Sequence, residues 1–505
     1  MIYSINEDIY SRNSGTEHAA AKRTQLFEGS KFVTKKYDRF LNRNLQSIGL
    51  QPEQVINMYD YFQGTTDVTR KEINVRDFSE IPNQDYYIDT ITPNYSMIRS
   101  QGNDVARINI LPATIGLVSD VEWFDRYNNL TVRENYDWRG FKSSVDHFDL
   151  DGQLSFTQYL NLEQVPVLEV AYMKVGDELR PTLFKLLRYE GERDFRFNSE
   201  EEMFAAFLNV LVEEDDNVVL ISDRRGLDSL IAEVPAAKKR YAMYHGLHTP
   251  DVDLLVAGKT DYRIFDIYRP SLSTLAGRLD GILVQTPEQK NDLEMMIHDY
   301  LSDFNQNVLV APDTFVQNTT NNTQRIRNRI IYAGLIADGK NLDQSISIIA
   351  EIKKKVPDVT FEIHGYFARP ELRTQLQNQI EELDLKNNVL LLDYVTGAEL
   401  DRVFENSELY LSTSSSESFN MSLVQALSFG VPVATIETTY GTNEIVEDNY
   451  NGLVFSKSES FHSIANKIVG YLNDQNKKIE MQENANKSAT KFSKENMLNQ
   501  FKELV

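Results

Sequence analysis

Residues 414–433 read SSSESFNMSLVQALSFGVPV, and this stretch decides the fold. It follows an apolar segment typical of a buried strand, and its second half predicts a helix that ends before another strand beginning at Val431. Glu417 lies in the loop, where its carboxylate is free to accept hydrogen bonds from hydroxyl groups. The first amides of the helix lack partners within it and suit an anion. A serine-rich loop alone is usually an exposed linker, but one that leads at once into a helix and a strand indicates a ligand-binding turn of an α/β domain.

Short apolar strands alternate with helices on both sides of this stretch. The predicted strands around it are 329–335, 359–364, 389–394, 408–412, 431–436 and 452–455. An Asn/Thr-rich segment, 317–324, is interpreted as a linker, and earlier strands are predicted at 1–5, 31–34, 218–222, 240–245 and 281–285, with a helix around 52–62. Such alternation implies crossover connections and parallel sheets. We therefore expect an α/β fold in which two doubly wound, Rossmann-like domains face a cleft with the carboxyl ends of their strands.

A different pattern interrupts the first of these domains. From about residue 68 to 189 apolar and polar residues alternate, as in 105–110 and 153–159, and turn signals such as Gln101-Gly102-Asn103 separate the segments. This pattern predicts an antiparallel β-meander. The expected parts are 1–66 and 196–312 for the two halves of the N-terminal domain, 67–195 for the inserted meander, 313–485 for the C-terminal domain and 486–505 for a C-terminal helix.

Composition argues against several classes of protein. The 505 residues include 52 Lys+Arg and 75 Asp+Glu, and the net charge of −23 disfavours binding to nucleic acid. The absence of cysteine removes disulfides, thiolate metal sites and cysteine nucleophiles together. Residues 1–15 lack the basic flank and apolar core of a signal peptide, and no run of about 18 apolar residues predicts a membrane span. We expect a cytoplasmic protein, or one that is peripheral at the inner face of the membrane.

Two further loops at strand ends suit an anion. Gly15 and Thr16 follow the first strand and open a helix, so this turn either approaches a phosphate or sugar closely or is an ordinary turn capped by Ser14 or Thr16. Gly334 and Lys340 bracket another turn before a helix, where a lysine suits a diphosphate. The alternative for Lys340 is a solvated side chain.

Two of the seven histidines, His245 and His248, follow a predicted strand at the end where α/β proteins place functional loops. No third ligand with suitable spacing accompanies them, so zinc is not expected. A structural role is favoured for His245, and contact with a substrate for His248.

These residues together carry a family resemblance. The spacing from Glu417 to Gln425, followed by Gly430-Val431-Pro432-Val433, is similar to the donor-binding signature of retaining glycosyltransferases of family 4, E-x7-E followed by G-x-P-V. The Gly15 loop, His248 and the Gly334 to Lys340 spacing fit the same group and imply its two-domain GT-B architecture. The insertion, through residues such as 136–143 (YDWRGFKS), resembles the β-meander of a subfamily that glycosylates bacterial surfaces. It includes glycosyltransferases of serine-rich and serine–aspartate repeat adhesins and wall teichoic acid α-N-acetylglucosaminyl- and glucosyltransferases.

The resemblance implies a UDP-sugar as co-substrate, first of all UDP-N-acetylglucosamine, with no metal and no other cofactor. It implies retaining transfer to serine hydroxyls of a repetitive adhesin or, as the alternative, to a teichoic acid polyol-phosphate. It also implies a homo-oligomer or a hetero-complex formed through the meander. The implied catalytic residues are Glu417, Lys340 and His248; the implied donor-binding residues are Gly15, Thr16, Gly339, Tyr394, Val395, Ser418, Phe419, Asn420, Met421 and Gln425; and the implied acceptor-side residues are His245 and Arg139.

Two positions depart from the family pattern. Leu335 stands where the family usually has an arginine, five residues before Lys340, and Gln425 replaces the second glutamate of the signature. Gln425 still accepts a hydrogen bond from a ribose hydroxyl, without the strength that charge adds. These departures favour a second hypothesis, a non-catalytic partner that binds the acceptor, whereas the presence of Glu417 favours an active enzyme.

Overall fold

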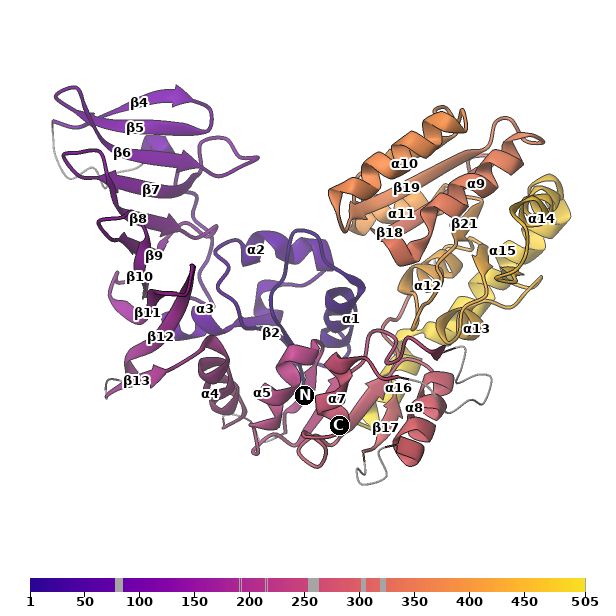
Figure 1. Ribbon diagram of the computed structural model, residues 1–505, viewed down its shortest axis with the longest axis horizontal. Coiled ribbons are helices and arrows are strands. Elements are labelled where there is room, and N and C mark those ends of the chain that lie inside the picture. Colours follow the sequence, from indigo (N-terminus) through magenta and orange to yellow (C-terminus); the bar gives the residue numbers. More distant parts are fainter. Residues whose placement is uncertain are drawn as a thin grey trace.

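The computed structural model describes residues 1–77, 85–189, 191, 193–213, 215, 217–252, 263–300, 306–317 and 324–504. These residues form two parallel sheets with helices and one long antiparallel sheet, which confirms the predicted fold class (Figure 1). Most of the expected Asn/Thr-rich linker, 318–323, lies outside the described residues.

The N-terminal domain contains, within the described ranges, a seven-stranded parallel sheet in the order β17-β16-β15-β14-β1-β2-β3. Its strands are β1 Ile2–Asn6, β2 Lys31–Thr34, β3 Val55–Asn57, β14 Val219–Ser222, β15 Lys239–Met243, β16 Gly281–Val284 and β17 Val308–Val310. Its principal helices are α1 Gly15–Thr24, α2 Leu41–Asn44, α3 Met58–Gln63, α4 Glu200–Glu213, α5 Asp228–Ala232, α7 Arg269–Leu272 and α8 Pro287–Tyr300. Strands β1, β14 and β16 are buried along their whole length, as expected for a parallel sheet covered on both faces.

The helix expected around residues 52–62 is only partly correct. Strand β3 occupies its centre and pairs with β2, and α3 begins after it at Met58. The β-branched pair Val55-Ile56 favours the extended conformation, and pairing with β2 supplies the hydrogen bonds of this edge strand.

The C-terminal domain has a six-stranded parallel sheet in the described chain, ordered β20-β19-β18-β21-β22-β23. Its strands are β18 Arg329–Ile336, β19 Thr360–Phe367, β20 Val389–Leu392, β21 Leu409–Ser412, β22 Val433–Ile436 and β23 Gly452–Phe455. Its helices are α9 Leu342–Lys353, α10 Pro370–Glu382, α11 Gly397–Glu405, α12 Met421–Ser428, α13 Gly441–Ile445, α14 Phe461–Asn473 and α15 Gln475–Ala489. One continuous apolar core includes residues from this sheet and from helices α9 to α15.

The end of the chain returns to the N-terminal domain. Helix α16, Lys494–Lys502, places Met497 and Phe501 in the same apolar cluster as Ile2 and Val219 of the first sheet. Helix α15 continues across the expected boundary after residue 485, so the last α-helix by itself is shorter than the segment expected from sequence.

The insertion is an antiparallel meander in which each strand pairs with the next along the chain, in the order β4 to β13. The strands are β4 Tyr87–Thr92, β5 Tyr95–Ser100, β6 Asn103–Ile110, β7 Val118–Phe124, β8 Leu130–Tyr136, β9 Lys142–Phe148, β10 Leu154–Leu160, β11 Pro166–Val175, β12 Glu178–Tyr189 and β13 Arg193–Phe197. The sheet leaves the N-terminal domain after α3 and returns to it at α4 (Figure 1).

One buried arginine ties the meander to the N-terminal domain. Arg139 lies in the turn between β8 and β9, and its side chain is 4% exposed. Its guanidinium donates to Asp137, to Asp60 of α3 at 2.8 Å and to the carbonyl oxygen of Thr65 at 2.7 Å, so each of its three nitrogens has a partner. The expectation that Arg139 lies on the acceptor side is therefore wrong: this side chain holds two parts of the fold together.

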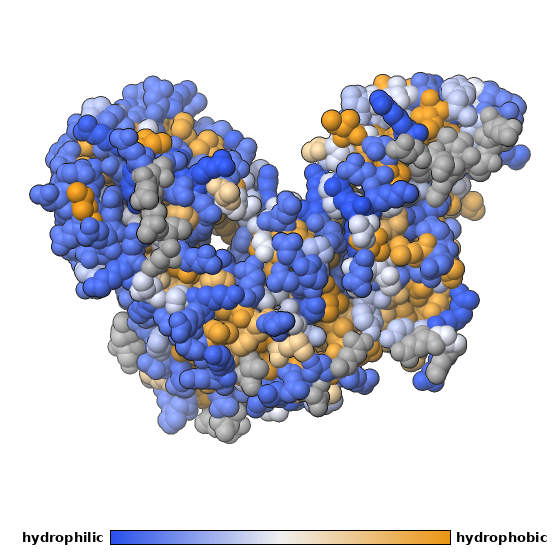
Figure 2. Space-filling view, turned by 180° about the vertical axis from the view of Figure 1, so that it is seen from behind, coloured by the Kyte–Doolittle hydropathy of each residue, from blue (hydrophilic) through white to orange (hydrophobic). Residues whose placement is uncertain are grey.

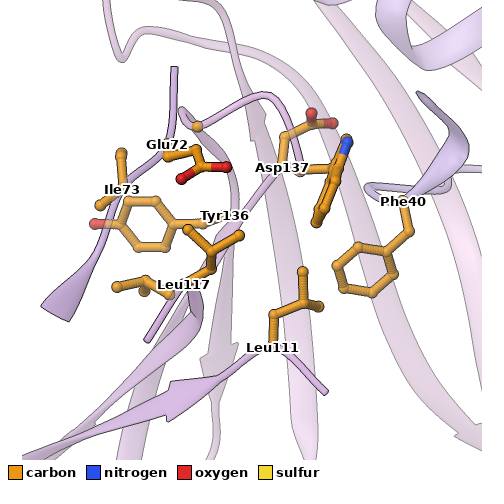
Figure 3. A pocket seen from close by; sticks show the side chains of 10 residues that line it. Phe40, Glu72, Ile73, Leu111, Leu117, Tyr136 and Asp137 are labelled. Atoms are coloured by element: carbon orange, nitrogen blue, oxygen red, sulfur yellow. The ribbon is translucent and has the colours of Figure 1, made fainter. Parts of the chain in front are cut away.

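The residue after Arg139 lets two chain segments meet closely. Gly140 has a φ of +85°, and a Cβ atom there would lie 1.5 Å from the carbonyl oxygen of Lys71. A gap of about 10 Å³ remains beside it (Figure 3), lined by residues that include Phe40, Ile73, Leu111, Leu117 and Tyr136. A gap of this size holds about one water molecule, so this contact is closely packed and has no room for a sugar.

The two ends of the molecule stand apart from each other. The meander and the C-terminal domain rise from opposite sides of the N-terminal domain (Figure 1). The space-filling view from behind shows a wide notch between these lobes and a largely hydrophilic surface (Figure 2).

Candidate active site

Two loops of the C-terminal domain meet at Glu417. The Lys340 ammonium donates to Glu417 Oε1 at 2.7 Å, and Asn420 Nδ2 donates to the same oxygen at 3.0 Å. The Glu417 side chain is 10% exposed and that of Lys340 is 26% exposed. The amide of Ser415 also donates to the carbonyl oxygen of Gly339 at 3.0 Å, which fixes one loop against the other. The structure thus brings together two candidates that lie 77 residues apart in the sequence.

The start of helix α12 lies beside this pair. Asn420 is its N-cap residue in a left-handed conformation, with φ 76° and ψ 80°, and its side chain bonds to Glu417 and not to the helix. Phe419 is buried in the core, where its ring packs edge-on against Phe492. Only the backbone of Phe419 is therefore left for the contact with the sugar donor that was expected from the sequence. Ser418 donates to the carbonyl oxygen of His245 at 2.7 Å and thereby joins the loop to the N-terminal domain.

The Gly15 loop faces the same helix from the other domain. A Cβ atom on Gly15 would lie 3.5 Å from the terminal carbon of Met421, the first residue of α12. Ser14 is the N-cap of α1 and donates from its amide to the Glu17 carboxylate at 2.9 Å. Ser14 therefore caps the helix as in an ordinary strand-to-helix turn. Gly15 is nevertheless exposed, so the same turn is also open to a ligand.

Tyr394 forms a second contact across the domains. Its hydroxyl lies 2.8 Å from His18 Nε2 of α1, and its ring meets Tyr366 edge-on. Burial raises the pKa of Tyr394 to about 12 and lowers that of His18 to about 4, so both are neutral at pH 7. Gln425 lies in α12 after its first turn and reaches Asp401 at 3.5 Å.

The buried histidine His245 is enclosed by carboxylates. Its Nε2 lies 2.8 Å from Asp223 and its Nδ1 lies 3.0 Å from Asp313, while Arg23 forms a second ion pair with Asp223. Burial opposes the charge, but the two carboxylates prevail and raise the pKa of His245 to about 9. Because the carboxylates of Asp223 and Asp313 enclose the ring, His245 has the structural role favoured above, and its assignment to the acceptor side stays a prediction.

His248 is completely buried beside the other domain. Its Nε2 lies 3.1 Å from the sulfur of Met296 in α8, and its ring stacks on Tyr440 with centroids 6.2 Å apart. Burial lowers the pKa of His248 to about 4, so the ring is neutral at pH 7. In this structure His248 supports Tyr440, and its expected contact with a substrate stays a prediction.

The charge on His245 makes the stability depend on pH. Because folding raises its pKa from 6.5 to about 9, the stabilisation is complete below pH 6.5 and is lost as pH rises through about 9. We expect the free energy of unfolding to fall over this interval, and less steeply in a His245→Asn variant. Urea unfolding across the interval measures the difference. The exposed His462 provides the matched control, and equal slopes for His245→Asn and the wild type would contradict the assigned charge.

Two further residues, Tyr440 and Arg224, contribute to this region although neither was predicted from the sequence. Tyr440 has a positive φ of 74° and forms an isolated parallel β-bridge with Glu417. Its hydroxyl donates to Asp292 of α8 at 2.7 Å. Arg224 follows β14 and forms an ion pair with Glu17. The sequence does contain a signal for Arg224, because two consecutive arginines follow the carboxyl end of a buried strand. Nothing in the local sequence marks Tyr440.

The described residues contain neither a candidate metal site nor a candidate membrane span. No group of three or more histidine, aspartate or glutamate side chains in that part of the chain has a geometry that would hold a metal ion. None of its helices is both long and apolar enough to cross a membrane.

Comparison with protein families identifies the C-terminal domain. Residues 316–490, which include Lys340, Glu417 and Gln425, match the model "Glycosyl transferases group 1". Residues 86–176 of the meander match "GtfB middle domain". Residues 316–490 form a group 1 glycosyl transferase domain. The resemblance inferred from the sequence is thereby confirmed for the glycosyltransferase domain and for the inserted sheet.

Individual relatives of this glycosyltransferase are distant. A poly(glycerol-phosphate) alpha-glucosyltransferase of Bacillus subtilis is 25% identical over 385 residues, which are 75% of this chain but only 54% of that relative, so the match spans about half its length. The UDP-N-acetylglucosamine–peptide N-acetylglucosaminyltransferase GtfA subunit of Streptococcus gordonii is 23% identical over 471 residues, covering 91% of this chain and 88% of that one. The crystal structure of the pneumococcal O-GlcNAc transferase GtfA in complex with UDP and GlcNAc superposes with a TM-score of 0.83 at 20% identity, over 100% and 98% of the two chains. This last likeness shows the fold.

Proposed function

We propose that this glycosyltransferase moves N-acetylglucosamine from UDP-N-acetylglucosamine to serine hydroxyls of a repetitive bacterial surface adhesin. The observation that carries the proposal is the Lys340–Glu417 pair at the start of α12, opposite the Gly15 loop of the other domain. The Streptococcus gordonii GtfA subunit, a relative that aligns over most of both chains, is named as a transferase of this sugar from this donor to peptide.

The site residues divide the chemistry between charge and position. We assign the leaving diphosphate to Lys340, to the free amides at the start of α12 and to the Gly15 loop, and we assign the sugar hydroxyls to Glu417. The uridine then lies towards Tyr394, Val395 and Gln425. No metal takes part in this assignment.

The proposed reaction retains the configuration of the sugar. The bond between the anomeric carbon and the β-phosphate oxygen breaks, and the serine oxygen bonds to the same face of that carbon. The serine proton passes to the departing phosphate oxygen, so the products are UDP and the glycosylated serine. Catalysis is then mainly positioning and electrostatic stabilisation of the diphosphate. Closure of the two domains excludes water, which would otherwise hydrolyse the donor.

Two further assignments extend the proposal. The aligned relative is named a subunit, and we propose that the meander joins this chain to a second copy or to another chain of an adhesin-glycosylating complex. We also propose that it acts in the cytoplasm before the adhesin is exported.

One relative favours a different acceptor. The Bacillus subtilis enzyme is named for poly(glycerol-phosphate), so a teichoic acid polymer is the second candidate. Incubation of the whole chain with labelled UDP-N-acetylglucosamine separates the two acceptors. A serine-rich repeat peptide should take the label, while the same peptide with alanine for serine should not. Label in poly(glycerol phosphate) alone would reassign the acceptor, and label in neither would overturn the proposed function.

A further inference from the structure

Lys340 is the cationic side chain that the C-terminal domain contributes to the proposed diphosphate site, and a diphosphate needs more positive charge than this. A nucleoside diphosphate carries more than one negative charge, and the Lys340 ammonium is already paired with Glu417. The Gly15 loop contributes another carboxylate nearby, because Glu17 lies in the first turn of α1. Electrostatic stabilisation of a leaving diphosphate therefore favours a further cation at this position.

Arg224 lies beside the Gly15 loop. Its guanidinium contacts the Glu17 carboxylate, with Nε at 3.1 Å, and donates from Nη2 to Ser14 Oγ at 3.1 Å. The Arg224 side chain is 40% exposed, whereas Glu17 is 4% exposed, so the arginine extends towards solvent from a buried partner. The side chain of the nearby Arg23, by contrast, is only 1% exposed within its ion pair with Asp223.

A short chain of contacts connects Arg224 with the proposed site. Ser14, which Arg224 contacts, precedes Gly15, and Gly15 lies against Met421 at the start of α12. Asn420, the preceding residue, bonds to Glu417, which holds Lys340. These contacts link Arg224 to Lys340 through the Gly15 loop and the start of α12.

The charges of Glu17 and Arg224 also act on the sheet of the C-terminal domain. The pKa of Tyr366 is raised chiefly by burial and then by the charge of Glu17, while the charge of Arg224 opposes the rise. Tyr366 pairs in register with Leu335 at the carboxyl end of β18. The charge of Arg224 thus acts on the strand ends where the diphosphate is proposed to lie, and Leu335 itself contributes none.

We propose that Arg224 is a donor-binding residue whose guanidinium contacts the diphosphate from the N-terminal domain, opposite Lys340. This inference rests on the proposed function. It differs from a role in which Arg224 only neutralises the buried carboxylate of Glu17.

Calorimetric titration of the whole chain with UDP and with uridine tests the inference. Arg224→Gln should weaken UDP binding by about 10- to 100-fold, the range expected for a hydrogen bond to a charged group, and should leave uridine binding unchanged. Arg278→Gln is the matched control, because Arg278 is 47% exposed, pairs with Glu233 and precedes β16 at the opposite end of the sheet. It should bind UDP as the wild type does.

The double variant Glu17→Gln/Arg224→Gln separates the two roles. If Arg224 binds the diphosphate, UDP binding stays weak in the double variant. Recovery of wild-type affinity would mean that Arg224 only neutralises Glu17 and would overturn the inference. Equal UDP binding by Arg224→Gln and the wild type would overturn it as well, with the proposed function intact. Failure of the wild type to bind UDP would instead overturn both.

Discussion

Replacing Glu417 with glutamine is expected to lower the transfer rate by about 10²- to 10³-fold, the usual cost of removing one preorganised electrostatic group. Glutamine keeps the size of the side chain but removes the charge that holds the Lys340 ammonium at 2.7 Å. It also changes the group that is proposed to orient the sugar. Initial rates of label transfer at saturating donor measure the effect, and the thermal unfolding temperature shows that the fold is retained.

The same domain offers a matched control for Glu417. Glu362 on β19 is 16% exposed and also has a cationic partner, Arg329, but it lies well before the carboxyl end of its strand. Glu362→Gln should keep the wild-type rate. A Glu417→Gln enzyme with the wild-type rate would show that the transfer site lies elsewhere.

Replacing Arg139 with methionine should have the largest effect on stability. The change leaves the carboxylates of Asp137 and Asp60 buried without their cation, and removal of one partner from a buried ion pair costs about 3–5 kcal/mol. Folding already raises the pKa of Asp60 because burial outweighs the charge of Arg139. Urea unfolding followed by tryptophan fluorescence measures the loss, since the two tryptophans of the chain, Trp123 and Trp138, are both in the meander.

Arg180 provides the control for this prediction. It pairs with Glu178 near the turn between β11 and β12, and its side chain is 60% exposed. Arg180→Met should change the free energy of unfolding by no more than about 0.5 kcal/mol. An Arg139→Met variant that is as stable as Arg180→Met, yet transfers no sugar, would return Arg139 to the acceptor side.

The pairing of Glu417 with Lys340 follows from features that a sequence displays. Both residues follow predicted strands of one parallel sheet, and β18 and β21 prove to be neighbours in it. Carboxyl ends of adjacent parallel strands meet at one edge, so the two loops had to lie close together. The meander was predictable for a similar local reason, because alternating residues and turn signals recur along it.

The errors concern residues whose surroundings come from distant parts of the chain. Arg139 stands in a polar hairpin turn and looks exposed, but its partner Asp60 lies 79 residues earlier. The burial of His248 likewise depends on Met296 and, from the other domain, on Tyr440. Burial of this kind depends on how domains dock, which local spacing does not encode.

A crystal structure of the wild-type chain with UDP tests the proposed site most directly. We expect the diphosphate between Lys340 Nζ and the first amides of α12, on the side that faces Gly15, with the uridine towards Tyr394 and Gln425. A nucleotide bound elsewhere, with the Lys340–Glu417 pair unchanged and away from any phosphate, would contradict the assignment of this cleft as the donor site.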